Sequence, residues 1–203
     1  VFVRWDAKTH KVCEQNDIHL RGEHNLENIG AASLAALAAG ATLHEVRDGA
    51  KQFKGLPHRL ELVGAVGGVS FYNDSFSTVP ETTIAAIQSF EEPIILIAGG
   101  SEKGSDFREL GNVIANSQVK VLIVIGQMTD RIVIAARDGG FSGRIVTGLT
   151  TMRQIVSAAF EFAASDDVIL LSPAAASFDM FPNYKERGKQ FGYEITRLAY
   201  KTS

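Results

Sequence analysis

The chain has 203 residues, of which 45% are hydrophobic and 21% are charged. This balance is typical of a globular protein with a substantial core, and the length allows one large domain or a domain and a half. A formal net charge of −3 provides no basic field, so we expect no nucleic-acid partner. No apolar run approaches the roughly 18 residues that a membrane span needs, so we expect no membrane partner.

The cysteine content and the first residues bear on where the protein works. Cys13 is the single cysteine, which excludes an internal disulfide and fits a reducing, cytoplasmic compartment. Residues 1–5 have the pattern of a strand and not of a signal peptide. Because Val1 is not a methionine, we expect the chain to be a piece of a longer protein, and we expect a monomer.

The first part of the chain predicts a β-ribbon followed by two helices. Residues 1–5 favour a strand, and a second strand is predicted around 11–13 after a turn at 6–8. Helical spacing follows over about 25–40 and over 42–53. The segment 55–59, GLPHR, breaks both patterns and predicts a domain boundary between residues 56 and 57.

From residue 57 onward the pattern alternates between strands and helices. A hairpin is predicted over 60–72 around two glycines. Later strands are predicted at 93–100, 119–126, 144–146 and 167–172, and helices at 80–90, 107–116, 130–137, 152–164 and 184–200. The strands are nearly continuous Val/Ile/Leu runs, typical of strands covered on both faces. We therefore predict an α/β fold with a Rossmann-like, doubly wound, mostly parallel sheet.

Two polar clusters lie near the predicted boundary and helix start. Asn25 and Asn28 are three residues apart, so they share a helix face and could pair with the edge of a purine. Simple N-capping by Asn25 is an equally good interpretation. Arg59 could bind phosphate through two parallel hydrogen bonds. Taken alone, this segment favours a surface ion pair between Arg59 and Glu61.

Two further clusters follow predicted strands. In the segment 72–81, Asp74 could accept a hydrogen bond from a ribose hydroxyl and Thr78 could donate to a carboxylate, although such segments are usually capped turns. In the segment 99–107, Lys103 beside glycines is typical of an anion-binding loop. The alternative is a solvated lysine with Ser105 or Asp106 capping the next helix. The G-x-x-x-x-G-K-[ST] spacing of a phosphate-binding loop is absent from the chain.

The segment 171–188, LSPAAASFDMFPNYKERG, is the most informative. A buried strand ends in small residues before a helix, which places the hydroxyl of Ser177 and open backbone N–H groups at the carboxyl edge of the sheet. Ligands bind at that edge in open α/β sheets, and the following helix N-terminus favours an anion.

Together and in this order, five segments resemble the C-terminal part of the Mur ligases, the ATP-dependent amide-forming enzymes of peptidoglycan synthesis. They are GEHNLENIGAA, GLPHRLELV, YNDSFSTVPETTIAAI, LIAGGSEKGSDF and LLSPAAASFDMFPNYKERGKQF. The resemblance covers about residues 20–198 and is greatest to the members that add D-glutamate to UDP-N-acetylmuramoyl-L-alanine.

This resemblance implies roles for particular residues. The nucleotide would be bound by Asn25, Asn28, His58, Arg59 and Asp74. D-Glutamate would be bound by Thr78, Lys103, Ser177 and backbone near Tyr184. No catalytic or metal-binding residue is implied within this chain.

The resemblance also implies how the intact enzyme is divided. Residues 1–56 would end the central ATP-binding domain, and residues 57–203 would form the amino-acid-binding domain. ATP and Mg²⁺ would be required, but their phosphate-binding loop and metal ligands would lie upstream, so we expect this chain alone to be inactive. The intact enzyme would act through an acyl phosphate and serve peptidoglycan biosynthesis, and with it cell shape and division.

One position departs from the family pattern Asn-Asp-Ser-Lys-Ala-Thr-Asn. Phe76 occupies the place of the lysine, which removes a cation and bears on which amino acid is bound. Alternatives are another Mur-type or folylpolyglutamate-type ligase, a domain retained for protein contacts, or a non-catalytic Rossmann-like nucleotide-binding module. Against the last, no G-x-G-x-x-G with an acidic residue about 20 positions later follows a strand.

Overall fold

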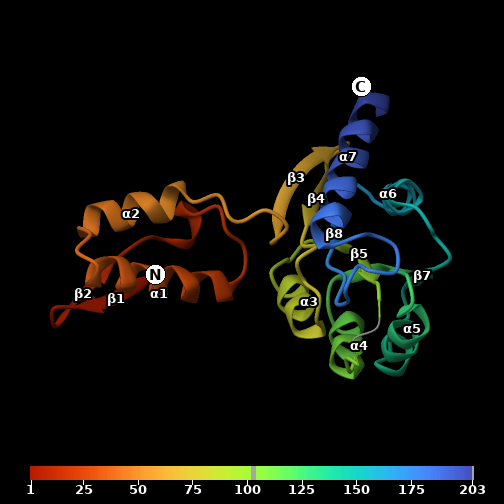
Figure 1. Cartoon of the computed structure of the whole chain (residues 1–203), viewed down its shortest axis with the longest axis horizontal. Coiled ribbons are helices and arrows are strands. Elements are labelled where there is room, and N and C mark those ends of the chain that lie inside the picture. The colour runs from red at the N-terminus through yellow and green to blue at the C-terminus, as the bar shows by residue number, and fades with distance from the viewer. Residues whose placement is uncertain (102–103, 203) are drawn as a thin grey trace. The chain divides into compact units, whose positions relative to one another are not determined.

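The computed structural model describes residues 1–101 and 104–202 and contains two compact units, Val1–Leu56 and Pro57–Ser203. The division falls inside the segment 55–59, where the sequence predicts a boundary. Each unit has its own apolar core, and the elements of both are labelled in Figure 1.

The first unit begins with an antiparallel ribbon of β1 (Phe2–Trp5) and β2 (Lys8–Lys11). Asp6 and Ala7 connect them with φ of 48° and 58°, the left-handed pair that a tight two-residue hairpin requires. The prediction of a second strand at 11–13 is wrong, because this turn is tighter than expected and β2 begins earlier. Val12 and Cys13 instead lie in the core of this unit, each 2% exposed.

Two helices complete the first unit, after a short 3₁₀ turn at Gln15–Asp17. The first, α1, spans Glu23–Ala38, with Gly22 as its N-cap, so the interpretation of Asn25 as an N-cap is wrong. The second, α2 (Leu43–Gln52), begins with a capping box in which Thr42 and Glu45 satisfy each other's backbone N–H. These helices bury Ile29, Leu37 and Val46 against the ribbon and the segment after it.

The second unit is an α/β fold, as predicted. Its six-stranded sheet has the order β3-β4-β8-β5-β6-β7. The strands are β3 (Glu61–Val66), β4 (Val69–Asn73), β5 (Ile94–Gly99), β6 (Val119–Ile125), β7 (Arg144–Val146) and β8 (Val168–Leu171). The helices are α3 (Pro80–Ile87), α4 (Arg108–Ala115), α5 (Thr129–Asp138), α6 (Met152–Glu161) and α7 (Tyr184–Thr202). Among the named strands of this sheet, β3 and β4 pair antiparallel and the other neighbouring strands pair parallel.

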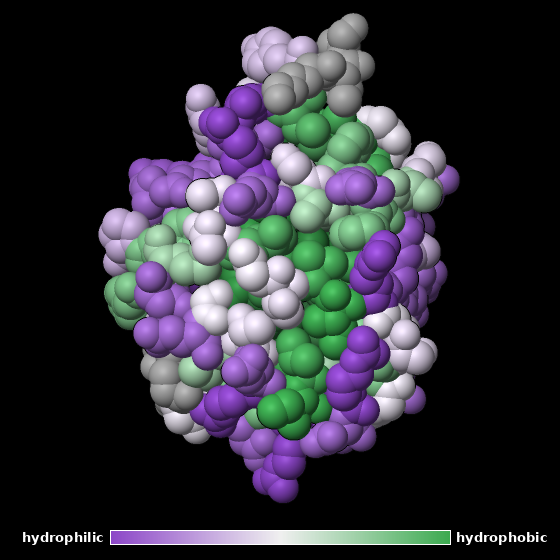
Figure 2. All heavy atoms as spheres, turned by 90° about the vertical axis from the view of Figure 1, so that its right-hand side faces the viewer, coloured by the Kyte–Doolittle hydropathy of each residue, from purple (hydrophilic) through white to green (hydrophobic). Residues whose placement is uncertain are grey.

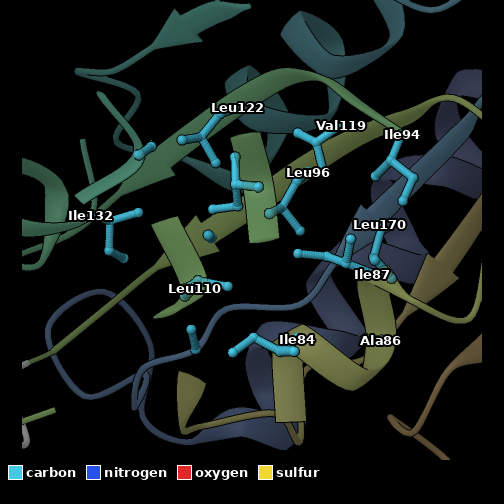
Figure 3. Close-up of a cluster of buried hydrophobic side chains, with 14 of the residues drawn as sticks. Ile84, Ala86, Ile87, Ile94, Leu96, Leu110, Val119, Leu122, Ile132 and Leu170 are labelled. Atoms are coloured by element: carbon cyan, nitrogen blue, oxygen red, sulfur yellow. The ribbon is translucent and has the colours of Figure 1, made fainter. Parts of the chain in front are cut away.

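Helices cover both faces of this sheet. Ile84, Leu110 and Ile132 from α3, α4 and α5 pack into one apolar layer (Figure 3). Ile155 from α6 and Phe191 from α7 pack into the layer on the opposite face. Because the helices after β5 and β8 leave on opposite faces, a topological switch point lies at the carboxyl ends of these adjacent strands, where α/β folds bind ligands.

The far edge of the sheet is short. Figure 2 views the side of the molecule that carries β7, and shows a band of apolar surface bordered by polar side chains. The edge strand β7 has three residues, Arg144–Val146, which pair with β6 on one side only. A short edge offers few free backbone groups to another strand and so limits edge-to-edge pairing.

Glycines set the closeness of α4 and α5. A Cβ at Gly111 would lie 2.1 Å from the carbonyl oxygen of Ala135, and a Cβ at Gly139 would lie 2.7 Å from backbone atoms of Gly111. The two helices therefore touch through their main chains. In contrast, a Cβ at Gly192 in α7 would make an ordinary 3.4 Å contact with Val63.

We expect Gly111→Ala to lower the free energy of unfolding of the second unit by about 1–3 kcal/mol, because the added methyl forces the helices apart. Urea denaturation of the chain provides the measurement. The matched control, Gly192→Ala, should unfold at the same or a higher urea concentration, because alanine is the better helix former. Equal stability of the Gly111→Ala variant and the unsubstituted chain would contradict the main-chain contact.

Candidate functional site

Three loops meet at the carboxyl edge of the sheet, after β4, β5 and β8. The backbone N–H of Ala174 donates to the carbonyl of Ser77 at 3.0 Å, which joins the loops after β8 and β4. Ser101 donates to the carbonyl of Ala176 at 2.8 Å and joins the loops after β5 and β8. The segments that carry Thr78 and Ser177 are thereby attached to one rim at the switch point.

Small residues at this rim are required by close main-chain contacts. A Cβ at Gly100, which has φ of 149°, would lie 2.0 Å from the carbonyl oxygen of Ala176. Ala174 is fully buried and has φ of 59°, a left-handed conformation that is unfavourable for a residue with a side chain. The run of small residues that the sequence places here thus permits backbones to touch.

The predicted amino-acid-binding residues lie as follows. Thr78 is half-buried just before α3, Ser177 is 2% exposed in the loop after β8, and Tyr184 is the half-buried first residue of α7. Lys103 lies outside the described residues. Within the described part of the chain, no side-chain hydrogen bond uses the hydroxyl of Thr78 or Ser177. Their role in binding a carboxylate stays a prediction.

Asp74 is the buried centre of a hydrogen-bond network. It is 5% exposed, and its Oδ2 accepts hydrogen bonds from the hydroxyls of Ser77 at 2.5 Å and Ser172 at 2.7 Å. Its Oδ1 accepts from the backbone N–H of Leu60 at 3.2 Å. Burial raises the pKa of the Asp74 carboxyl above its ordinary value, and the hydroxyl donors oppose this rise. The carboxylate thus braces the turn, and its proposed contact with nucleotide stays a prediction.

His58 is held by the neighbouring hairpin. Its backbone N–H donates to Oε2 of Glu61 at 2.8 Å, and its Nδ1 lies 2.9 Å from Nδ2 of Asn73. The interpretation of Glu61 as an ion-pair partner of Arg59 is wrong, since Glu61 accepts hydrogen bonds from His58 and Asn73 instead. A Cβ at Gly188 would lie 2.3 Å from His58 Nδ1, so the position in α7 beside the imidazole ring has no room for a side chain.

Phe76, at the position of the family lysine, lies between a cation and an aromatic ring. The guanidinium Cζ of Arg59 lies 4.1 Å from the centroid of the Phe76 ring, within the range of a cation–π contact. Tyr184 meets the same ring edge-on, with centroids 5.0 Å apart and an interplanar angle of 86°. We call Arg59, Phe76 and Tyr184 the aromatic stack. The ring of Phe76 thus offers an aromatic face to the guanidinium of Arg59.

The remaining predicted nucleotide ligands belong to the first unit. Nδ2 of Asn28 donates to Oδ1 of Asn25 at 3.4 Å, which confirms that the two carboxamides share one face of α1. Nδ2 of Asn25 also donates to the carbonyl of Arg21 at 2.7 Å. The predicted nucleotide set is therefore divided between the two units, and its purine contact stays a prediction.

A cavity of about 540 Å³ lies at the carboxyl ends of β6 and β7, lined by Thr129, Thr150 and Asp179 among others, and contains none of the predicted ligand-binding residues. Among the described residues, no group of three His, Cys, Asp or Glu side chains is arranged to hold a metal ion. Within the same residues, no helix combines the length and apolarity needed to cross a bilayer.

Sequence reasoning missed Asn73, Ser75 and Arg187. Asn73 accepts a hydrogen bond from the backbone N–H of Ser75 at 3.2 Å, and Arg187 is fully buried beside Ser75. An arginine in the first turn of a polar helix is ordinarily exposed, so the sequence carried no signal of this burial.

The raised pKa of Asp74 gives a test of the network. Because the native state binds this proton more tightly than the unfolded chain, the contribution of Asp74 to stability is present below pH 3.8 and is lost as pH rises through the raised pKa. The stability of the unsubstituted chain relative to Asp74→Asn should therefore fall from about pH 3.5 to 7, measured by urea denaturation.

Asp106→Asn is the matched control for this pH series. Hydrogen bonds from Arg108 lower the pKa of Asp106 to about 2, so the corresponding stability difference should have the opposite slope and decrease as pH falls. A difference for Asp74→Asn that grows with pH would show that the hydroxyl donors outweigh burial.

Residues 58–175 match the family model described as Mur ligase, glutamate ligase domain. A UDP-N-acetylmuramoylalanine–D-glutamate ligase of Thermoanaerobacter sp. (strain X514) is 40% identical over 98% of this chain and 43% of the relative. A ligase of the same name from Pelotomaculum thermopropionicum is 44% identical over 89% of this chain and 39% of the relative. The chain thus spans less than half the length of these curated relatives.

Solved structures share the fold at low sequence identity. UDP-N-acetylmuramate-alanine ligase of Thermotoga maritima has a TM-score of 0.66 at 16% identity, over 89% of this chain and 40% of that one. A folylpolyglutamate synthase of Mycobacterium tuberculosis has a TM-score of 0.62 at 17% identity, over 86% of this chain and 41% of that one. Since the family model covers more than half of the chain and the curated relatives align along nearly all of it, the chain belongs to the Mur ligase family.

Proposed function

We propose that this chain is the C-terminal part of an ATP-dependent ligase that joins D-glutamate to UDP-N-acetylmuramoyl-L-alanine in peptidoglycan synthesis. The observation that carries the proposal is the rim at the switch point, where the loops bearing Thr78 and Ser177 are attached to each other. Support also comes from D-glutamate ligases that are 40% identical along 98% of the chain.

The rim suits a small dicarboxylate. Hydroxyl groups at Thr78 and Ser177 are neutral donors at the carboxyl edge, and Lys103, which lies outside the described residues, would supply the cation. A cation with several neutral donors can bind two carboxylates and leave the amine of glutamate free to react. The unit Pro57–Ser203 would therefore be the amino-acid-binding domain, with backbone near Tyr184 completing the site.

Among the residues assigned to the nucleotide, Arg59, Asn25 and Asn28 have environments that suit this role better than that of Asp74. The exposed guanidinium of Arg59 is oriented by the aromatic stack and suits a phosphate. Asn25 and Asn28 present carboxamides on one face of α1, which suits an adenine edge. The carboxylate of Asp74 is already occupied by three donors, so it fits better as a brace beneath His58 and Arg59.

ATP would phosphorylate the carboxylate of UDP-N-acetylmuramoyl-L-alanine to give an acyl phosphate and ADP, and Mg²⁺, when bound, would neutralise the phosphate charge. The part of this chain is to hold glutamate by its carboxylates with the amine directed toward that acyl carbon. Holding both reactants in place supplies much of the acceleration in such a reaction. Residues 1–56 would end the ATP-binding domain, and the phosphate-binding loop would lie upstream.

A two-stage experiment tests this function. In thermal-shift assays, millimolar D-glutamate should stabilise the chain weakly, whereas NAD should not. In the full-length protein, ATP hydrolysis should depend on both UDP-N-acetylmuramoyl-L-alanine and D-glutamate, and the chain alone should show neither hydrolysis nor ligation.

A panel of amino acids supplies the contradicting outcomes. L-Glutamate, glycine and L-lysine are tested beside D-glutamate, because Phe76 removes a cation that the family places near the site. Preference for another amino acid would overturn the assignment of D-glutamate as the substrate, but it would be compatible with a ligase. Stabilisation by NAD alone would overturn the assignment as a ligase. ATP hydrolysis by the chain alone would overturn the expectation that the phosphate-binding loop lies upstream.

The aromatic stack gives a second prediction. Phe76→Leu keeps an apolar side chain but removes the ring under Arg59, so the KM for ATP should rise about two- to fivefold with little change in kcat. Tyr193→Leu, at a tyrosine of α7 that is 66% exposed, is the control and should leave both constants unchanged. An unchanged KM for ATP in Phe76→Leu would contradict the orienting role of the ring.

A further inference from the structure

We propose that Arg187 is a positioning residue that fastens the loops after β4 and β8 to each other and so fixes the glutamate-binding rim. This inference rests on the proposed function, because it concerns the same rim. Arg187 lies in the first turn of α7 and is fully buried. It touches neither of the proposed glutamate-binding hydroxyls through a hydrogen bond, so its action is indirect.

The guanidinium of Arg187 connects the two loops directly. On the β4 side, its Nε donates to Oγ of Ser75 at 2.9 Å and its Nη2 donates to the carbonyl of Ser75 at 2.9 Å. On the β8 side, both terminal nitrogens donate to the carbonyl of Ala175 at 3.2 Å, and Nη1 also reaches that of Ala176 at 3.4 Å. One planar group thus spans the loops that carry Thr78 and Ser177.

The contacts continue to the other parts of the rim. The hydroxyl of Ser75 donates to the carbonyl of Tyr184 at 2.8 Å, which attaches the start of α7. The carbonyl of Ala176, which Arg187 reaches, also accepts from the N–H of Ser101 in the loop after β5. A Cβ at Gly100 would lie 3.3 Å from Nη1 of Arg187, so this loop also passes close to the guanidinium.

The chemistry of the site requires arginine and not merely a positive charge. The hydrogen bonds of Arg187 to Ser75, Ala175 and Ala176 all go to neutral oxygens, and a guanidinium presents its donors as a rigid planar fork. Burial lowers the pKa of Arg187 to about 10, and the charge of Asp179 opposes this fall, so the side chain stays protonated at neutral pH. A lysine ammonium is a compact donor that cannot reach both loops with this geometry.

The variant Arg187→Lys tests the proposal in the full-length protein. We expect the KM for glutamate to rise about tenfold or more, with the KM for ATP changed less than about twofold. Ser75→Ala removes the hydroxyl that accepts a hydrogen bond from Nε of Arg187 and adds no charge. This variant should also raise the KM for glutamate, by a smaller factor. Arg197→Lys in the same helix is the control and should leave both constants unchanged.

Hydrogen exchange measured by NMR on the chain alone gives a readout that needs no substrate. The N–H groups of Ala174 and Ser101, which join the loops, should exchange at least about tenfold faster in Arg187→Lys and in Ser75→Ala. The N–H groups of the central strand β5 should keep their rates. A role limited to stability would instead accelerate exchange throughout the second unit and would not separate the two KM values.

The outcomes are distinct. Unchanged exchange at Ala174 and Ser101 in both variants, or equal rises of the two KM values, would overturn the positioning role. If the unsubstituted protein does not use glutamate, the proposed function fails, and the exchange measurements alone decide whether Arg187 fixes the rim. If Arg187→Lys does not fold, Ser75→Ala decides by the same two readouts.

Discussion

The carboxyl edge of the sheet is held by contacts between main chains. Gly100 approaches the carbonyl of Ala176, and Ala174 adopts a left-handed conformation while its N–H bonds to Ser77. Neither contact tolerates a large residue, because the space is taken by backbone atoms. The small residues of the segment 172–177 therefore follow from packing first, and an open site for a ligand carboxylate follows from the same lack of bulk.

Polar side chains complete this arrangement from beneath. Asp74 accepts hydrogen bonds from the hydroxyls of Ser77 and Ser172 and from the backbone N–H of Leu60. Arg187 donates hydrogen bonds to Ser75 and to two carbonyl oxygens of the loop after β8. In each case a buried charge is surrounded by neutral hydrogen-bonding groups. Such groups are costly to bury unless their bonds are made, so they select one loop conformation over its alternatives. The hydroxyls of Thr78 and Ser177 are left unused by this network.

The sequence was a good guide to the layers and a poor one to the loops. Continuous Val/Ile/Leu runs predicted the parallel strands, because a strand that is buried on both faces needs apolar residues at consecutive positions. The second strand of the N-terminal ribbon was misplaced, because a two-residue turn at Asp6 and Ala7 has no strong glycine signal. Burial of Arg187 depends on Ser75, which is distant in sequence, so no local pattern could predict it. The contact between His58 and Glu61 is local, but it depends on the left-handed backbone of His58, with φ of 65°, which the residue type does not indicate. The ligand roles of the nine predicted site residues came from family resemblance, and Lys103 lies outside the described residues.

The place of β8 in the sheet has a consequence for how the chain matures. This strand is the last of the sheet in the sequence, yet it pairs with β4 on one side and β5 on the other. Until residues 168–171 are made, β4 and β5 have unpaired edges and the sheet remains in two halves. Long-range pairing of this kind slows folding and exposes strand edges to other chains. The second unit can therefore reach its native topology only after most of its own core residues have been made.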